Sequence, residues 1–265
     1  MTGFDERTGL AAKIARQAGE KILEIQKGDM GTVSKGLNDV LTIADTAAEE
    51  IITSAISKMF PDDAIIAEES GSKAGHTGYT WVIDPLDGTV NYSRRLPIYA
   101  VSVGCLKDGV PHGGAIFLPV TSELFVCQRG QGSWLNNERI SVSANGLDKS
   151  IAAIGISNRP KSKPLLQWHC DMHKSLMENT MTVHKLFCAA AGLCYVAGGR
   201  MELLCELDCF LWDIAAGALL VEEAGGKITQ TNGSPMDYTH VENQRFLCTN
   251  GKVHEKALEL VRPKQ

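Results

Sequence analysis

The sequence predicts a mixed α/β protein built as one unit, and three observations support this prediction. Segments with helical spacing of apolar residues and short strand-like apolar runs are interspersed along all 265 residues. Hydrophobic residues make up 44% of the chain, which is enough for a large core and too many for a disordered protein. No stretch is rich enough in Pro, Ser or charge to be a linker. We therefore expect a single domain over residues 1–265, with two lobes meeting near residues 140–150 as the alternative.

The first half should begin with helices and continue with strands. Apolar residues recur on one face of Asp5–Gln26, which predicts an amphipathic helix there. A second helix is expected over Thr46–Met59 and should stop before Pro61. Short apolar runs bounded by Pro, Gly and Asp-Gly turns then predict five strands, at Ala64–Ala67, Tyr79–Ile83, Tyr99–Leu106, Gly113–Leu118 and Glu123–Cys127.

The second half should alternate between strands and helices. The predicted strands are Ala152–Ile156, Lys227–Thr231 and Arg245–Thr249. The predicted helices are Pro164–Glu178, Cys188–Ala197, Asp213–Ala224 and His254–Val261. The pair Gly225-Gly226 directly after the third of these helices is a normal helix stop.

Charge and composition exclude several classes of protein. The net charge is −5 with no basic run, which argues against binding to a nucleic-acid polymer. No apolar stretch approaches the roughly 20 residues that span a bilayer, and the first residues do not resemble a signal peptide, so we expect a cytoplasmic protein without membrane contact. The eight cysteines include no CxxC pair, and most lie in apolar runs, so we expect reduced thiols.

Acidic residues at the ends of two predicted strands are the most informative feature. Glu68 and Glu69 end one apolar run, and Asp84 ends the next, followed by Asp87. Lys and Arg are absent from Trp81–Ser93, so no neighbour in sequence neutralises these carboxylates. A hard divalent cation with oxygen ligands, most simply Mg²⁺, would do so. The alternative is a set of solvated turn acids, because Asp-Pro and Asp-Gly are common turn pairs.

The turn in this region, DPLDGT, suits a phosphate ligand. Pro85 fixes its own φ angle and stiffens the loop, and Gly88 allows a ligand to approach the backbone. Thr89 supplies a hydroxyl group. If Gly88–Asn91 begins a helix, its free N–H groups face the same place as the carboxylates and can bind phosphate. Carboxylates that hold Mg²⁺ beside an anion site predict phosphoryl transfer.

Four segments resemble the motifs of the inositol monophosphatase family. WVIDPLDGTVNY at 81–92 resembles the signature WxxDPxDGTxNF, and WDIAAGALLVEEAGG at 212–226 matches the second signature. The Glu-Glu-Ser of 68–70 and DVLTIAD at 39–45 match two further elements, and all four occur in family order. The resemblance covers essentially the whole chain. It implies a layered αβαβα sandwich of the inositol monophosphatase and fructose bisphosphatase type, a Mg²⁺-dependent and lithium-sensitive phosphatase, and a homodimer.

The resemblance also implies a set of metal ligands. Glu68, Asp84 and the backbone carbonyl of Leu86 would hold one Mg²⁺. Asp84, Asp87 and Asp213 would hold a second, and Glu68 would share a weaker third. The alternative role for Asp213 is to cap the helix that it opens.

The resemblance further implies how water and phosphate are handled. Thr89, with Asp45 and Glu69 behind it, would orient and help deprotonate the attacking water. The backbone amides of Gly88 and Thr89 would bind the phosphate. Asp45 precedes a predicted helix, so a helix cap is its alternative role. None of the seven histidines belongs to this set.

Substrate choice should depend on residues outside these motifs. Glu206, seven residues before Asp213, stands where inositol-hydrolysing members bind sugar-like hydroxyls; the alternative is a surface acid in a hairpin over Glu206–Phe210. Asp213 would also contact the substrate.

One segment departs from the family pattern. Phe187-Cys188-Ala189 stands where members commonly carry Gly, a hydroxyl residue and Ala, which indicates a more apolar wall beside a substrate contact at Ala189. Inositol monophosphate is the expected substrate. Histidinol phosphate, fructose bisphosphate, phosphoadenosine phosphate and NADP are the alternatives, and a metal-dependent binding module is the non-enzymatic one.

Overall fold

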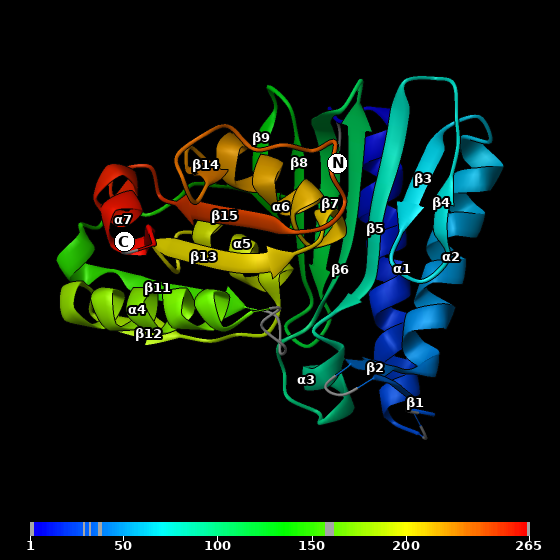
Figure 1. Cartoon of the computed structure of the whole chain (residues 1–265). Coiled ribbons are helices and arrows are strands. Elements are labelled where there is room, and N and C mark those ends of the chain that lie inside the picture. The colour runs from blue at the N-terminus through cyan, green and yellow to red at the C-terminus, as the bar shows by residue number, and fades with distance from the viewer. Residues whose placement is uncertain (1–2, 29, 32, 37–38, 157–161, 264–265) are drawn as a thin grey trace.

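The chain forms five layers, helix–sheet–helix–sheet–helix (Figure 1). The computed structural model describes residues 3–28, 30–31, 33–36, 39–156 and 162–263. Helices α1 (Glu6–Gln26) and α2 (Ile43–Met59) cover one face of the first sheet, and α5 (Ala189–Ala197) and α6 (Leu211–Glu223) lie between the two sheets. The outer face of the second sheet carries α4 (Lys163–Asn179) and α7 (His254–Val261). The predicted layered sandwich is confirmed.

The first sheet has eight strands in the order β10-β9-β8-β7-β6-β5-β3-β4. Their bounds are β3 Ala64–Ala67, β4 Gly71–Lys73, β5 Tyr79–Asp87, β6 Ala100–Lys107, β7 Val110–Leu118, β8 Glu123–Gln128, β9 Gly132–Leu135 and β10 Glu138–Ile140. Only β3 and β5 run parallel among these described strands, so their carboxyl ends lie at the same edge. A separate hairpin pairs β1 (Val33–Gly36) with β2 (Asp39–Leu41), and α3 (Thr89–Ser93) follows β5.

The second sheet has five strands in the order β12-β11-β13-β15-β14. Their bounds are β11 Ile151–Ile156, β12 Thr182–His184, β13 Leu203–Cys209, β14 Lys227–Gln230 and β15 Gln244–Thr249. The chain passes from the first sheet to the second between Ile140 and Ile151, through a short 3-10 helix at Leu147–Lys149.

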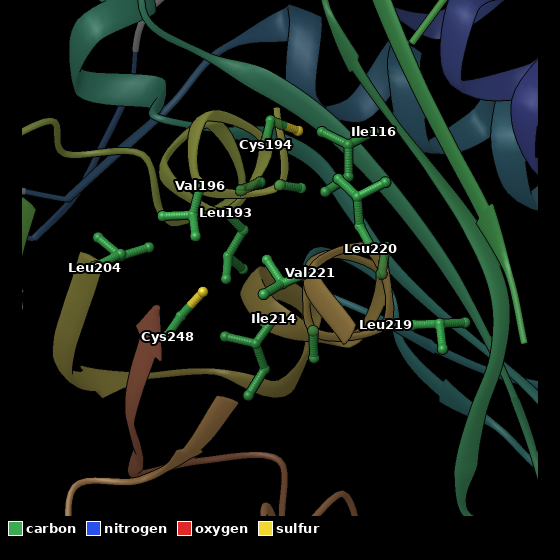
Figure 2. Close-up of a cluster of buried hydrophobic side chains, with 14 of the residues drawn as sticks. Ile116, Leu193, Cys194, Val196, Leu204, Ile214, Leu219, Leu220, Val221 and Cys248 are labelled. Atoms are coloured by element: carbon green, nitrogen blue, oxygen red, sulfur yellow. The ribbon is translucent and has the colours of Figure 1, made fainter. Parts of the chain in front are cut away.

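The core between the sheets is built around α5 and α6, which are apolar on all sides (Figure 2). A helix with this pattern must be covered all round, and a place between two sheets provides such cover. Close packing of the helices requires Gly217, where a Cβ atom would lie 2.4 Å from the Leu193 side chain. The helices thus join the two sheets into one packed body, and the site described below lies along this join.

Most predicted elements are found with bounds shifted by a few residues, and two of the differences concern acidic residues. Strand β5 continues through Asp87 instead of ending at Ile83, so Asp84 lies within the strand. Its register with β6 shifts between Asp84 and Asp87, where β5 contains one extra residue, and this bulge accommodates Pro85, which has no N–H for the ladder. The alternative for Glu206, a surface acid in a hairpin over Glu206–Phe210, is wrong, because Glu206 lies in β13 with partners on both sides.

Candidate active site

Two acidic residues proposed as helix caps lie instead at the third position of their helices. Thr42 is the N-cap of α2, and Asp45 Oδ2 accepts hydrogen bonds from the Thr42 backbone N–H and hydroxyl, both at 2.7 Å. Asp213 Oδ2 accepts from the Phe210 N–H at 2.7 Å at the start of α6. Each carboxylate thus reaches back to its helix start with one oxygen, as in a capping box. The other oxygen remains for the site.

Asp45 uses its other oxygen to contact the turn after β5. The Thr89 hydroxyl lies 3.1 Å from Asp45 Oδ1 and 2.9 Å from the Leu86 carbonyl oxygen, and it can donate its one proton to either. Burial and the charge of Glu69 raise the pKa of Asp45, against the lowering effect of its bonds to Thr42. The structure therefore brings Asp45, Glu69 and Thr89 together from three separate segments of the chain.

Four carboxyl groups converge beside this trio. Asp84 is only 2% exposed, and its burial, followed by the charges of Glu68, Asp87 and Asp213, raises its pKa well above the usual range. Burial raises the pKa of Asp87 to about 6, and burial with the charge of Asp87 raises that of Asp213 to about 7. Such shifts mark carboxylates that repel one another in a poorly solvated place.

The parallel pairing of β3 and β5 creates this convergence. Glu68 follows directly after β3, and its N–H donates to the Ile83 carbonyl of β5. After Asp84 the chain makes a tight turn, in which the Leu86 N–H donates to Asp84 Oδ1 at 2.9 Å. Both acids thus stand at the same edge of the sheet, and the start of α6 brings Asp213 to it from the neighbouring layer.

The start of α5 is fixed by Asp87. Its Oδ2 accepts from the Ala190 N–H at 2.7 Å, and the Ala189 amide also lowers its pKa. The Cys188 thiol contacts the Asp87 carbonyl oxygen at 3.4 Å. The predicted substrate contact at Ala189 is therefore 8% exposed and lies against a carboxylate of the cluster.

Gly88 stands where no other residue fits. Its φ is +90°, and a Cβ atom would lie 3.0 Å from the Ile98 carbonyl and 3.3 Å from both Cys188 and the Phe187 carbonyl. A side chain would clash with the backbone and meet an unfavourable left-handed conformation. The glycine thus lets the turn of Thr89 and the start of α5 approach each other closely.

Glu206 faces the cluster from β13. Burial, with the charges of Asp87 and Asp213, raises its pKa to about 8, and Lys185 opposes this shift. A Cβ atom at Gly155 would lie 1.7 Å from Glu206 Oε2, so the glycine on β11 leaves room for the carboxyl group. Its carboxyl group therefore lies close enough to Asp87 and Asp213 for their charges to act on it.

Two supporting residues were missed by sequence reasoning. Glu49 is buried in α2 and accepts from the N–H groups of Glu69 at 2.9 Å and Ser70 at 2.8 Å, which fixes the acidic turn after β3. Asn91 donates from Nδ2 to the carbonyls of Ile98 at 2.7 Å and Leu186 at 2.9 Å, which links α3 to the chain before α5. Glu49 had a signal: it lies four residues after Asp45, on the inward face of α2.

The donor set fits a hard divalent cation. The cluster offers carboxylate and carbonyl oxygens only, and the groups with the largest charge effects on the pKa of Asp84 are all acidic. Among the described residues, no three His, Cys, Asp or Glu side chains form a group with the spacing of a metal site. The described carboxylates thus act on one another through their charges, but their side chains are not arranged as a ready-made metal site.

Comparison with known proteins identifies the family. Residues 4–265 match the model of the inositol monophosphatase family. The chain belongs to this family. It is 35% identical over 260 residues to the Nus factor SuhB of Pseudomonas aeruginosa, covering 96% of this chain and 95% of that protein. It is 39% identical over 228 residues to the Nus factor SuhB of Escherichia coli, covering 84% and 85%.

Solved structures of the family have the same fold. The extragenic suppressor protein SuhB of Bartonella henselae superposes with a TM-score of 0.91 at 28% identity, over 97% of this chain and 98% of that one. The inositol monophosphatase of Anabaena superposes with a TM-score of 0.83 at 32% identity, over 96% of each chain. Relatives in this family thus carry both an enzyme name and a Nus factor name.

Three expectations outside the site can also be compared with the structure. No helix in the described part of the chain is long and apolar enough to cross a membrane. All eight cysteines are free thiols, and all except Cys170 are buried. His169 and His254 are held inside the protein, where burial lowers the pKa of each to about 4.

Proposed function

We propose that this protein is a Mg²⁺-dependent phosphomonoesterase that hydrolyses a small polyol or sugar phosphate, with inositol monophosphate as the first candidate. The observation that carries the proposal is the convergence of Glu68, Asp84, Asp87 and Asp213 beside the Thr89–Asp45 hydrogen bond. Membership in the inositol monophosphatase family supports it, as does the likeness to an Anabaena protein of that name. We expect the enzyme to be a homodimer.

In this proposal the carboxylates and one carbonyl hold two or three Mg²⁺ ions. Glu68, Asp84 and the Leu86 carbonyl are the ligands of one ion, and Asp84, Asp87 and Asp213 those of another. When bound, the ions make a water molecule more acidic and neutralise charge on the phosphate. Asp84 lies between its acidic neighbours and is the natural shared ligand. It is also the most buried of the four carboxylates, since Glu68, Asp87 and Asp213 are each partly exposed.

Thr89 positions the attacking water. A Thr89 hydroxyl that donates to Asp45 keeps its lone pairs, and with them it accepts a hydrogen bond from water on the cluster side. Asp45 is suited to take up the proton, because burial and Glu69 raise its pKa. The backbone N–H groups of Gly88 and Thr89 then bind phosphate oxygens. Because residue 88 is a glycine, no side chain there blocks the approach of the phosphate.

Glu206 selects the alcohol part of the ester. A carboxyl group next to Asp213, with space supplied by Gly155, can bind hydroxyl groups of a polyol. Asp213 and the start of α5 at Ala189 border the same space. The exposed Phe187 and the buried Cys188 give this border an apolar character, which leaves room for sugar phosphates other than inositol phosphate.

A second function is favoured by the names of the relatives. The Pseudomonas and Escherichia proteins are called Nus factors, so this chain is also a candidate for a Nus factor role in which phosphate release is not required. A protein that turns over no phosphate ester and yet binds a partner would fit this alternative. The two roles differ in their need for Asp84.

A phosphate-release screen tests the proposal. Inositol phosphates, histidinol phosphate, fructose bisphosphate, phosphoadenosine phosphate and NADP are offered to the wild type and to Asp84→Asn, with Mg²⁺ or with EDTA. We expect Mg²⁺-dependent release from a polyol phosphate, lost in the variant. A strong preference for a nucleotide would overturn the role of Glu206. No release from any ester would leave the Nus factor candidate as the better one.

A further inference from the structure

A cavity of about 730 Å³ lies at the outer face of the second sheet, away from the carboxylate cluster. Trp168 of α4, Arg245 of β15, Arg262 after α7 and the segment 230–244 line it. Its volume falls within the range of small-molecule sites. None of these residues belongs to the site proposed above.

The second sheet separates this cavity from the carboxylate cluster. In the ladder of β13 and β15, Glu206 pairs with Phe246 and Leu207 pairs with Arg245. Successive residues of a strand point to opposite faces, so Arg245 and Glu206 lie on opposite faces of the sheet. Phe246 packs in the core between the sheets, whereas Leu207 packs beneath α4 and α7. A ligand of the cavity would therefore bind independently of a substrate at Glu206.

The cavity has a fixed aromatic floor. The Trp168 indole N–H donates to the Val261 carbonyl of α7 at 2.6 Å, which holds the ring between the two helices. The Arg245 guanidinium lies 5.6 Å from the centre of this ring. The guanidinium lies over the face of the indole, and its own outer face is a flat surface on which another planar ring can stack, above Trp168.

The two guanidinium groups of the cavity form no ion pair within the described residues. Arg262 donates a hydrogen bond to the Asn232 carbonyl at 3.5 Å, and its charge also acts on Glu255, which is already paired with Lys227. Of the two acids in the lining, Asp237 is already bound to His240 and to the N–H and hydroxyl of Thr239. The other, Glu242, lies on the exposed loop. Unpaired guanidinium groups at a cavity suit a phosphate.

We propose that this cavity is a second ligand site, for a nucleotide, separate from the site of hydrolysis. The ring of the nucleotide stacks against Trp168 and Arg245, and its phosphate binds Arg262 together with Arg245. Asn232, whose Oδ1 already accepts from Ser234, turns its amide donors to the ligand. A planar ring and an anion together are the chemistry that this combination of side chains recognises.

Calorimetric titration with AMP, in EDTA, tests the proposal. Without metal the carboxylate cluster is acidic and repels phosphate, so heat of binding reports on the cavity and does not depend on turnover. We expect one AMP per chain. Arg245→Gln and Arg262→Gln should each weaken binding about tenfold, the loss of one charged hydrogen bond. Arg139→Gln, an exposed arginine on the first sheet, and Asp213→Asn should leave it unchanged.

Three results would overturn the inference. The first is no binding of AMP at millimolar concentration, and the second is equal binding by the wild type and the Arg245→Gln/Arg262→Gln double variant. The third is equally tight binding of inorganic phosphate and AMP, which would mean that the adenine ring contributes nothing to binding. Both arginines are exposed. If the variants unfold at the same temperature as the wild type, misfolding is excluded as the cause of a loss of AMP binding.

Discussion

Two buried carboxylates at opposite ends of the paired strands β3 and β5 have opposite electrostatic character. Asp63, just before β3, is 1% exposed, and Asp84, near the end of β5, is 2% exposed. Asp63 accepts from Arg7 Nε at 2.8 Å, Arg7 Nη2 at 3.0 Å, the Thr77 hydroxyl at 2.6 Å and the Trp81 indole at 3.0 Å. Asp84 faces other acids instead.

The pKa values of the two groups separate a structural acid from one prepared for a ligand. Burial alone would raise the pKa of Asp63, but the bonds from Arg7, Thr77 and Trp81 lower it below the ordinary value. At Asp84 burial and neighbouring charge act in the same direction, and the pKa rises. The protein satisfies the charge of Asp63 with its own side chains and leaves that of Asp84 to be satisfied from outside.

The largest effect should come from Asp213→Asn. Asparagine keeps an oxygen for the Phe210 N–H and so preserves the start of α6, but it is a poor ligand for a hard cation. We expect turnover to fall a hundredfold or more, about 3 kcal/mol of transition-state stabilisation, measured as Mg²⁺-supported phosphate release. The metal-free protein should unfold at the same temperature or higher, because one repelling charge is gone.

The control for this variant is Asp171→Asn on α4, whose half-buried carboxylate accepts from Gln167 Nε2 at 3.1 Å; it should change neither quantity. An Asp213→Asn protein with more than about half of normal turnover would contradict a role at the metal, since this corresponds to less than ~0.5 kcal/mol. Unchanged turnover with normal stability would reduce Asp213 to a helix cap.

Removing the ion pair of Arg7 and Asp63 should have the opposite pattern of effects, a loss of stability without a loss of turnover. Arg7→Met leaves the buried Asp63 without its cation, and we expect a loss of about 2 kcal/mol in the free energy of unfolding, about 5 °C in the thermal midpoint. Turnover per folded molecule should not change. Arg139→Met, an exposed arginine without such a bond, is the matched control. If a fully folded Arg7→Met protein lost activity, Asp63 and the carboxylate cluster would not be independent, and the separation of a structural acid from a site acid would be contradicted.

The pH dependence of stability should distinguish the two sites without a mutation. In EDTA the pKa values of Asp87 and Asp213 are raised to about 6 and about 7 in the folded protein. The stability that these groups contribute is fully present below the pKa of an unfolded Asp, and it is lost as the pH rises through their folded values. We expect the metal-free protein to be about 3 kcal/mol more stable at pH 5.5 than at pH 8. The lowered pKa of Asp63 contributes stability that is lost only as pH falls below its ordinary range.

Mg²⁺ should remove this slope, because bound carboxylates stay ionised. Thermal unfolding at pH 5.5 and 8, with Mg²⁺ and with EDTA, measures it. A Mg²⁺-dependent rise in the midpoint that is no greater at pH 8 than at pH 5.5 would contradict the assignment of the cluster as the metal site.

The smallest effect is expected for Glu49→Gln. A neutral amide accepts more weakly than a carboxylate from the N–H groups of Glu69 and Ser70, which loosens the turn that holds Glu68. We expect a several-fold fall in turnover, below ~1 kcal/mol, and a higher Mg²⁺ requirement. Glu50→Gln, one residue away on the exposed side of α2, is the control. Equal Mg²⁺ requirements for the two variants would assign Glu49 a purely structural role.

Local patterns predicted much of the fold and pointed to Glu68, Glu69, Asp84 and Asp87, whereas Asp213 was added by the resemblance to the family motifs. Strand β3 and helix α7 were predicted to the residue, because a strong periodicity meets clear stops on both sides. Strand β5 was cut short at Ile83, since acids and a proline seldom continue a strand, and a ligand site is where this local rule fails.

Contacts between distant segments could not be predicted in the same way. Arg7 and Asp63 are 56 residues apart, and neither lies in a motif. The cavity at Trp168 gathers residues from three separate segments, α4, the stretch 230–245 and the chain after α7, and none of these segments carries a motif. Glu49 was accessible in principle, because an acid on the inward face of a helix must contact a donor.

The bulge in β5 makes the length of its DPLD segment as important as its composition. In a regular strand, residues three apart point to opposite faces, so Asp84 and Asp87 could not both face the carboxylate cluster. The extra residue between them corrects this, since three steps on β5 match two on β6. The Leu86 carbonyl is part of the backbone, but its side chain is 1% exposed in the core, so only apolar side chains of similar size would keep that arrangement. Deleting or adding one residue would rotate Asp87 away from Asp84, so the length of this segment should be as constrained as the two carboxylates that it carries.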